Sequence, residues 1–265
     1  MLRLRTYQLG TLRQRGGGLY NFNGSATLTD VILSGNQASG EGGGVYNLGT
    51  LILISDTLSG NSTAVYGGGI SNETGALTMT DITLSANSSL YYGGIFNNLG
   101  LSTLTNVTLS GDSATLAGGG IFNNSGTPRL TNVTLSGNSA EVGGSISSAA
   151  PISLTNTIVA NSPSSGNCSA ALGGAENLSS DNTCGFGAGR DNVDVLLSPL
   201  GNYGGPTLTQ LPIPGSPAID YGIDIGCPST DQRGLPRPAG LRCDVGAVER
   251  QAVDAGSVYE PLILR

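Results

Sequence analysis

Three aspartates recur at almost equal spacing near the start of the chain, at Asp30, Asp56 and Asp81. Stacked carboxylates about 5 Å apart can act as the acid and the nucleophile of a retaining glycosidase, and their oxygens also suit Ca²⁺. The same spacing continues through amides, at Asn106, Asn132 and Asn156. Because no aromatic platform for a sugar and no further acid joins this row, we expect a solvated polar ladder in preference to an active site.

The composition of the 265-residue chain excludes most other chemistries. It contains no His, and its 11 basic residues are all Arg. A Ser-His-Asp triad, a His-ligated zinc site, a Schiff-base lysine and a Walker phosphate loop are therefore excluded, and we expect neither a metal nor a cofactor.

A net charge of −7 argues against a nucleic-acid partner. No apolar stretch approaches about 20 residues, so we expect no transmembrane span. The sequence leaves the oligomeric state open.

Four cysteines fall into two pairs with the same separation in sequence, Cys168 with Cys184 and Cys227 with Cys243. In a chain without His, this spacing favours two local disulfides over a metal site built from four thiolates or over free thiols. Disulfides predict an extracellular or cell-surface location. The basic start of the chain is not followed by the apolar core of a signal peptide, so we expect the sequence to be part of a longer exported protein.

Repeats at a nearly fixed period organise the chain from its start to residue 161. A Gly-Gly-apolar mark recurs at steps of 25 or 26, at Leu19, Val45, Ile70, Ile95, Ile121 and Ile146. A second apolar series follows at steps of 24 to 26, at Leu33, Leu58, Leu84, Leu109, Leu135 and Val159. Two polar series keep the same period, one at Asn36, Asn61, Asn87, Asp112, Asn138 and Asn161, the other at Asn21, Asn47, Asn72, Asn97, Asn123 and Ser147. Six such units predict a solenoid.

The glycine-rich half of each unit distinguishes between two kinds of solenoid. Residues 130–138 fit a leucine-rich repeat, which closes each unit with a helix or a helical turn. Residues 118–126 instead contain poor helix formers and two turn signals. We therefore predict an all-β parallel β-helix of about six coils, in which equivalent apolar side chains stack inside and the asparagines form structural ladders at the turns. Alternation places Leu104, Val107 and Leu109 inward, and Thr103, Thr105 and Thr108 outward.

Two outward surfaces are candidates for binding. Aromatic residues share one register, interrupted by Ser71, and we expect them to stack on one another in preference to stacking sugars. Thr-x-Thr pairs on another face resemble the flat arrays of β-helical ice-binding proteins. The aromatic residues are Tyr20, Tyr46, Phe96 and Phe122. The threonine pairs are Thr27/Thr29, Thr78/Thr80 and Thr103/Thr105, and the row breaks at Leu53/Ser55, Arg129/Thr131 and Ser153/Thr155.

The period ends after residue 161, and proline becomes more frequent. This part of the chain contains the motifs Asn177-Leu-Ser-Ser-Asp181, Pro214-Gly-Ser-Pro-Ala-Ile-Asp220, Asp231-Gln-Arg-Gly-Leu-Pro-Arg-Pro238 and Cys243-Asp-Val-Gly-Ala-Val-Glu249. With these motifs, residues 168–249 resemble the choice-of-anchor Q domain of bacterial surface proteins, and the repeats resemble, more loosely, those of polymorphic outer-membrane autotransporters. This resemblance implies export, a right-handed β-helix and attachment to the cell envelope, but no known reaction.

These observations divide the chain into β-helix repeats at 1–161, with a degenerate partial coil at 1–15, a capping module at 162–250 and a tail at 251–265. We expect Arg233 and Arg237 to pair with Asp231, Asp244 and Glu249 in a compact fold near the open end of the solenoid, where these pairs would cover its last apolar layer.

For function, we expect a non-catalytic, adhesin-like or stalk-like bacterial surface protein that binds a cell-envelope glycan or another surface ligand. Two alternatives remain open. One is a carbohydrate-active β-helix, a hydrolase or lyase that uses Asp30, Asp56 and Asp81. The other is an ice-binding protein.

Overall fold

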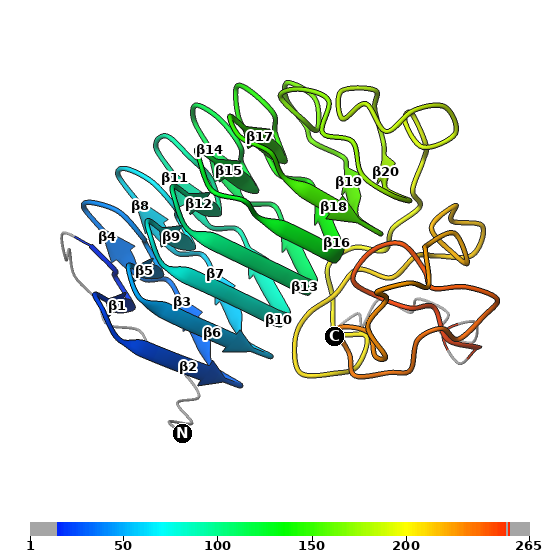
Figure 1. Ribbon diagram of the computed structural model, residues 1–265, viewed down its shortest axis with the longest axis horizontal. Helices are drawn as coiled ribbons and strands as arrows, with labels where there is room; N and C mark the ends of the chain where they lie inside the picture. The colour runs from blue at the N-terminus through cyan, green and yellow to red at the C-terminus, as the bar shows by residue number, and fades with distance from the viewer. Residues whose placement is uncertain (1–14, 253, 255–265) are drawn as a thin grey trace, which may run out of the picture.

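The fold is a parallel β-helix (Figure 1). The computed structural model describes residues 15–252 and 254, and in this part of the chain strands β1 to β20 wind into about six coils without any α-helix. The predicted all-β solenoid is confirmed. Nearly all of the predicted partial coil at 1–15 and most of the tail at 251–265 lie outside the described residues. No helix in the described part is apolar and long enough to span a bilayer.

The first sheet stacks one strand from each of six coils in the order β1-β5-β9-β12-β15-β17. Its registers pair every Gly-Gly-apolar mark with the next, from Leu19 with Val45 to Ile121 with Ile146. The predicted apolar ladder is therefore confirmed, and a bridge from Ile146 to Cys168 extends it by one rung. The strands are β1 (Leu19–Asn21), β5 (Val45–Asn47), β9 (Ile70–Asn72), β12 (Ile95–Asn97), β15 (Ile121–Asn123) and β17 (Ile146–Ser148).

The second sheet is the largest, and it turns a corner in every coil. Six corner residues have left-handed φ values between 49° and 59°, a conformation that Asp and Asn tolerate best among residues with a Cβ. Three strands run through the corner: β10 (Ala76–Ser85), β13 (Leu101–Ser110) and β16 (Arg129–Ser136). The strands before it are β2 (Ser25–Thr29), β6 (Thr50–Ile54) and β18 (Ser153–Thr155), and those after it are β3 (Ile32–Ser34), β7 (Thr57–Ser59), β19 (Ile158–Ala160) and β20 (Leu178–Ser179).

A third, short sheet closes the first four coils, and ladders of buried amides run from coil to coil. The side chain of Asn36 donates to Asn61, Asn61 to Asn87, and Asn87 to Asp112, each over 2.9 Å. A second ladder runs from Asn21 through Asn47, Asn72 and Asn97 to Asn123 over 2.8–2.9 Å. Both confirm the predicted asparagine ladders. The strands of this sheet are β4 (Gln37–Ala38), β8 (Ser62–Thr63), β11 (Ser88–Ser89) and β14 (Ser113–Ala114).

The predicted ladders are displaced by one residue in the sixth coil. Asn123 pairs with Ser148, and its side chain donates to the Ser148 hydroxyl, so Ser147 instead continues the aromatic register. Asn161 is exposed and has left-handed φ, as Gly137 has one coil earlier. The ladder position belongs to Ser162, whose N–H donates to the buried Asn167 side chain over 3.1 Å.

Residues 162–192 close the C-terminal end of the solenoid. The Cys168–Cys184 disulfide is buried, and Phe186 joins the continuous apolar core of the coils. Strand β20 pairs with β19, and Ala175 pairs with Thr155. Stacking therefore continues beyond the expected boundary at residue 161.

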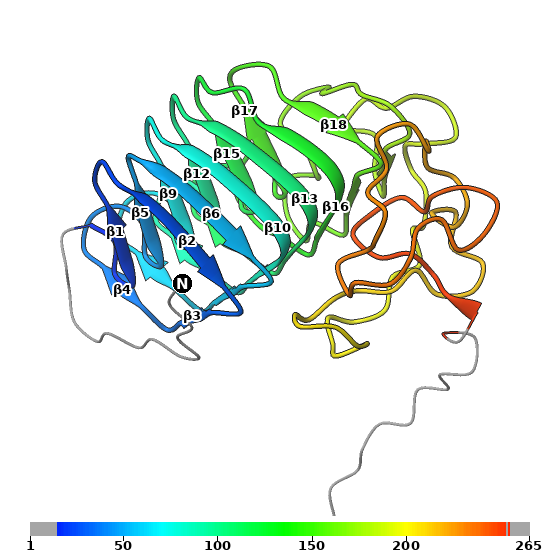
Figure 2. The same ribbon diagram turned by 60° about the horizontal axis from the view of Figure 1, so that its bottom comes forward.

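Residues 193–252 lie along the side of the solenoid, not over its end (Figures 1 and 2). They pack beside the corner of the second sheet, where Ile158, Val195, Ala218 and Val245 belong to a small second core. The expectation that the paired residues between Asp231 and Glu249 cover the last apolar layer is therefore wrong. The reason is that residues 162–192 already close the end, whereas the corner offers unpaired amides along several coils.

The apolar ladder should dominate the stability of the coils. We expect Ile95→Ala to lower the free energy of unfolding by about 3 kcal/mol, because it opens a cavity at a fully buried position. Ile32→Ala is the matched control, since that side chain is 42% exposed, and it should cost well under about 1 kcal/mol. Urea denaturation measures both values. Equal losses in the two variants would contradict the ladder's role.

Candidate functional site

The structure separates the three aspartates expected to form one row. Thr29 pairs with Ile54, and Ile54 with Thr80, so the corner after these residues holds Asp30, Ser55 and Asp81. Asp56 lies one residue further on, inside the solenoid. Asp30 is exposed, and Asp81 is partly buried two rungs away. The row predicted as a stack of three carboxylates is therefore wrong at Asp56, and the three side chains do not form one acidic surface.

Asp56 is buried and bonded to the backbone of its own and the neighbouring coil. Its carboxylate accepts the N–H of Val31 over 2.7 Å and that of Ile54 over 3.2 Å. Burial raises its pKa to about 6, although the two hydrogen bonds stabilise the charged carboxylate and lower the pKa. In the column that it occupies, the apolar Ile82 and Val107 lie above it. Asp56 is therefore a structural carboxylate without access to a substrate.

Asp81 adjoins the C-terminal segment. Its carboxylate accepts the side-chain amide of Asn106 over 3.0 Å, and its carbonyl accepts the Thr207 hydroxyl over 3.3 Å. Burial raises the pKa of Asp81 to about 6. Asp81 is the left-handed corner residue of its coil, and the segment that contains Thr207 partly covers this corner.

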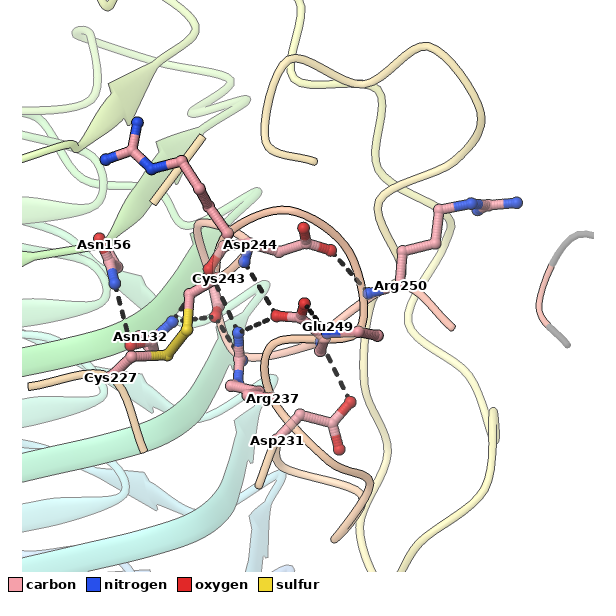
Figure 3. A network of polar contacts seen from close by, with 12 residues as sticks. Asn132, Asn156, Cys227, Asp231, Arg237, Cys243, Asp244, Glu249 and Arg250 are labelled. Atoms are coloured by element: carbon pink, nitrogen blue, oxygen red, sulfur yellow. Dashed lines mark hydrogen bonds and ion pairs between the residues drawn. A yellow bond between two sulfur atoms is a disulfide. The ribbon is translucent and has the colours of Figure 1, made fainter. Parts of the chain in front are cut away.

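The next corner residues of this row, Asn106, Asn132 and Asn156, bind the C-terminal segment and form a seam between it and the solenoid. Asn106 donates to the carbonyl of Thr230 over 2.8 Å. Asn132 donates to the carbonyl of Asp244 over 3.0 Å, as Figure 3 shows. Asn156 donates to the carbonyl of Ile223 over 3.0 Å and accepts its N–H over 2.8 Å. The corner amides therefore bind backbone groups of residues 193–252.

Gln232 is the central residue of this seam. It is fully buried, and its amide donates to the Thr83 hydroxyl over 2.9 Å and to the Ile82 carbonyl over 3.1 Å. Its carbonyl accepts the Thr108 hydroxyl over 2.6 Å. Thr108 points outward from its strand as predicted, yet this contact buries it completely. The sequence offered no local signal for Gln232, because its partners lie up to 150 residues away.

A buried ionic network holds the docked segment in shape (Figure 3). Arg237 lies 3.1 Å from Glu249, and Arg233 lies 2.9 Å from Asp231. These pairs were predicted from proximity in sequence. Burial lowers the pKa of Arg237. Because all four side chains are nearly inaccessible and paired with one another, the network is structural.

Asp244 and the second disulfide complete this network. The Asp244 carboxylate accepts the N–H of Asp220 over 2.7 Å and that of Arg250 over 2.6 Å. Burial raises the pKa of Asp244 to about 7. Cys243 next to it forms a disulfide with Cys227, so both predicted cysteine pairs are confirmed. In the part of the chain that the structure describes, no three Cys, Asp or Glu side chains are arranged to hold a metal ion.

The outward aromatic residues stack as expected. Tyr20 and Tyr46 have ring centroids 5.4 Å apart, and Phe96 and Phe122 have centroids 6.0 Å apart. Tyr92 joins the second pair, at 3.8 Å from Phe122. Because these rings lie mostly face to face, most of their faces are occupied by one another and not by a sugar.

A charged cluster that the sequence analysis missed lies beside Tyr46. Arg15 Nε is 3.2 Å from Glu41 Oε2, and the guanidinium lies 5.0 Å from the Tyr46 ring centroid. Glu73 accepts the Ser71 hydroxyl over 2.9 Å. Burial, followed by the charge of Glu73, raises the pKa of Glu41, and burial raises the pKa of Tyr46 to about 12. The sequence could have indicated this cluster, because both glutamates lie close to the Gly-Gly-apolar marks of successive coils.

In Figure 2, no segment among the described residues lies over the outer face of the second sheet before the corner. Its columns contain short side chains and a single charge, Arg129. The break that the sequence placed at Leu53/Ser55 is in fact Ile52/Ile54, because Leu53 points inward and is fully buried. One column is Thr27, Ile52, Thr78, Thr103, Arg129 and Ser153, and the next is Thr29, Ile54, Thr80, Thr105, Thr131 and Thr155.

Asp112 interrupts the amide ladder with a carboxylate. One of its oxygens accepts the N–H and the side-chain amide of Asn87 over 2.7 and 2.9 Å, whereas no described group donates to the other oxygen. At this position Asn87 and Asn138 donate to a leucine carbonyl of the preceding coil. A carboxylate cannot donate, and burial raises the pKa of Asp112 to about 7.

We expect Asp112→Asn to stabilise the protein at pH 8. The native pKa lies above the unfolded value of 3.8, so the natural chain loses stability as the pH rises from about 4 through about 7, by up to about 4 kcal/mol. Asn removes this loss and restores the missing donor. Urea denaturation at pH 5 and pH 8 measures the effect, with exposed Asp194→Asn as the control. A variant that is no more stable at pH 8 would refute this account.

We expect Gln232→Ala to loosen the C-terminal segment, because it removes the acceptor of the buried Thr108 hydroxyl and the amide that donates to Thr83, at a cost of about 2–3 kcal/mol. Hydrogen exchange should accelerate in residues 228–249 and stay unchanged in β12. Gln251→Ala is the control, since its amide bonds lie at the exposed edge. Unchanged protection of residues 228–249 in the Gln232 variant would show that the seam does not hold the segment.

The comparisons with known proteins provide no relative from which a function can be transferred. No family model matches the chain, no curated protein matches it, and no solved structure matches it. The description of the site therefore depends on the geometry above.

Proposed function

We propose that this protein is an exported, non-catalytic binding scaffold of adhesin-like or stalk-like character at the bacterial cell surface. The observation that carries the proposal is the open outer face of the second sheet, across strands β2, β6, β10, β13, β16 and β18. The coils hold this face rigid, and the C-terminal segment is locked beside it, not over it. A rigid, preorganised surface lowers the entropy lost on binding.

The two disulfides support the exported location. Disulfides persist in oxidising, extracytoplasmic compartments and are rare in the cytosol, and both Cys168–Cys184 and Cys227–Cys243 are formed. We extend the proposal to attachment at the cell envelope because residues 168–249 resemble the choice-of-anchor Q domain. The docked segment carries the motifs of that resemblance, at 214–220, 231–238 and 243–249.

The arrangement of carboxylates favours binding over hydrolysis. Asp56 is internal, and Asp30 and Asp81 are two rungs apart, which is about 10 Å. Ser55 lies between them, and the C-terminal segment flanks Asp81. A retaining pair requires about 5 Å, and an inverting pair requires about 6.5–9.5 Å with open space for a water between the carboxyls. The corner therefore supports docking of the chain's own segment better than it supports an acid pair.

The purified protein should bind material from bacterial cell envelopes without cleaving it. We expect it to sediment with an insoluble envelope fraction and to release no reducing or unsaturated sugars from a polysaccharide panel. Co-sedimentation and product assays measure the two properties. Turnover that is abolished by Asp30→Asn or Asp81→Asn would establish the hydrolase or lyase alternative and overturn the passive scaffold.

A further inference from the structure

We propose that the outer face of strands β2, β6, β10, β13, β16 and β18 binds an extended, neutral polysaccharide chain lying along the solenoid. This inference rests on the proposed function, because it names the ligand and the surface of the same scaffold.

The spacing of the face suits a repeating chain. Successive coils stack about 4.8 Å apart, and the two columns that begin at Thr27 and Thr29 are about 7 Å apart along each strand. A pyranose unit of an extended chain is of similar length to this spacing between coils. Hydroxyl groups of Thr78, Thr80, Thr103 and Thr105 therefore present the same donors and acceptors to successive sugars.

The charge of the face selects a neutral ligand. The chain carries a net charge of −7, yet none of these outward positions holds a carboxylate, and Arg129 is the only charged residue among them. A polyanion would meet one cation on an otherwise acidic protein, and a polycation would meet none of the acidic groups that it needs. A chain of sugar hydroxyls matches the hydroxyls of this face.

The size of the face disfavours a folded protein or a second copy. Six rungs and two columns, each about 7 Å wide along the strand, cover roughly 25 by 13 Å, or about 330 Å². A stable protein interface buries about 800 Å² on each partner. An extended chain needs only a narrow track, and its contacts add up with each rung that it covers.

Two irregularities favour a polysaccharide over an ice surface. Ile52 and Ile54 replace the threonine pair in the second coil, and Arg129 replaces the first threonine in the fifth. A long Arg side chain interrupts the flat fit that a crystal plane requires. A flexible chain can pass beside it, and the five N–H donors of the guanidinium can bind sugar hydroxyls.

Retention on insoluble cellulose, chitin, β-1,3-glucan and mannan tests the proposal, with alginate as the anionic comparison. We expect the natural chain to bind at least one neutral polysaccharide, and longer soluble oligosaccharides to compete better than disaccharides. Thr103→Glu should weaken this binding at least tenfold, because it buries a carboxylate under the chain. Thr115→Glu is the control, since Thr115 is exposed at a turn outside the face. Circular dichroism verifies that both variants are folded.

Each other result has a defined meaning. Equal binding by both variants would overturn the assignment of this face and leave the scaffold proposal standing. No retention on any neutral polysaccharide, or retention on alginate alone, would overturn the ligand class, while sedimentation with the envelope fraction would still support the scaffold. Inhibition of ice recrystallisation without polysaccharide binding would replace this proposal with the ice-binding alternative.

Discussion

The whole molecule depends on the stacking of each residue on its equivalent one coil away. Parallel pairing at a nearly constant period places the side chains of equivalent positions next to each other. A residue type that is favourable at one position is therefore repeated at the same position of the next coil. Apolar residues gain a continuous dry interior, and asparagines gain a partner for each amide that burial would otherwise leave unpaired. The same constraint makes a single carboxylate such as Asp112 a local defect, because its neighbours offer it donors on one side only.

The left-handed corner is where the stacking meets the rest of the chain. Asn and Asp are favoured there because of the backbone, whatever else they do. Once the amides are in place, their outward groups form a column of donors that the C-terminal segment binds with its carbonyls. A row that suggests catalysis in the sequence is thus explained by conformation first and by intramolecular docking second.

Much of the fold could be predicted from the period, whereas the exact register could not. Between the first two coils, the step from Asn21 to Asn47 is one longer than the step from Ser25 to Thr50, so one residue is lost in the turn between them. Spacing alone therefore matched Asp30 with Asp56, although the backbone pairs its corner with Ser55. The turn after β17 shortens in the same way, so the position equivalent to Asn138 is Ser162; Asn161 was assigned to the ladder by its residue type.

The position of the C-terminal segment could not be predicted for a different reason. It depends on contacts between Gln232 and Thr83, 149 residues apart, and no periodic pattern links them. The paired charges within the segment were predictable because they lie close in sequence, but they specify its shape and not its location. The open face was predictable in composition, and its threonines were assigned correctly in three coils.

The seam also restricts the number of coils that it spans. Its contacts extend over four consecutive corners, from Asp81 to Asn156, so the docked segment fits only one rotation and rise of those coils. Duplicating or deleting a whole repeat before Asp81 leaves the spacing of these four corners unchanged. Changing the number of coils within it would place every amide one rung away from its carbonyl. Repeat number in this architecture is therefore free to vary at one end and fixed at the other.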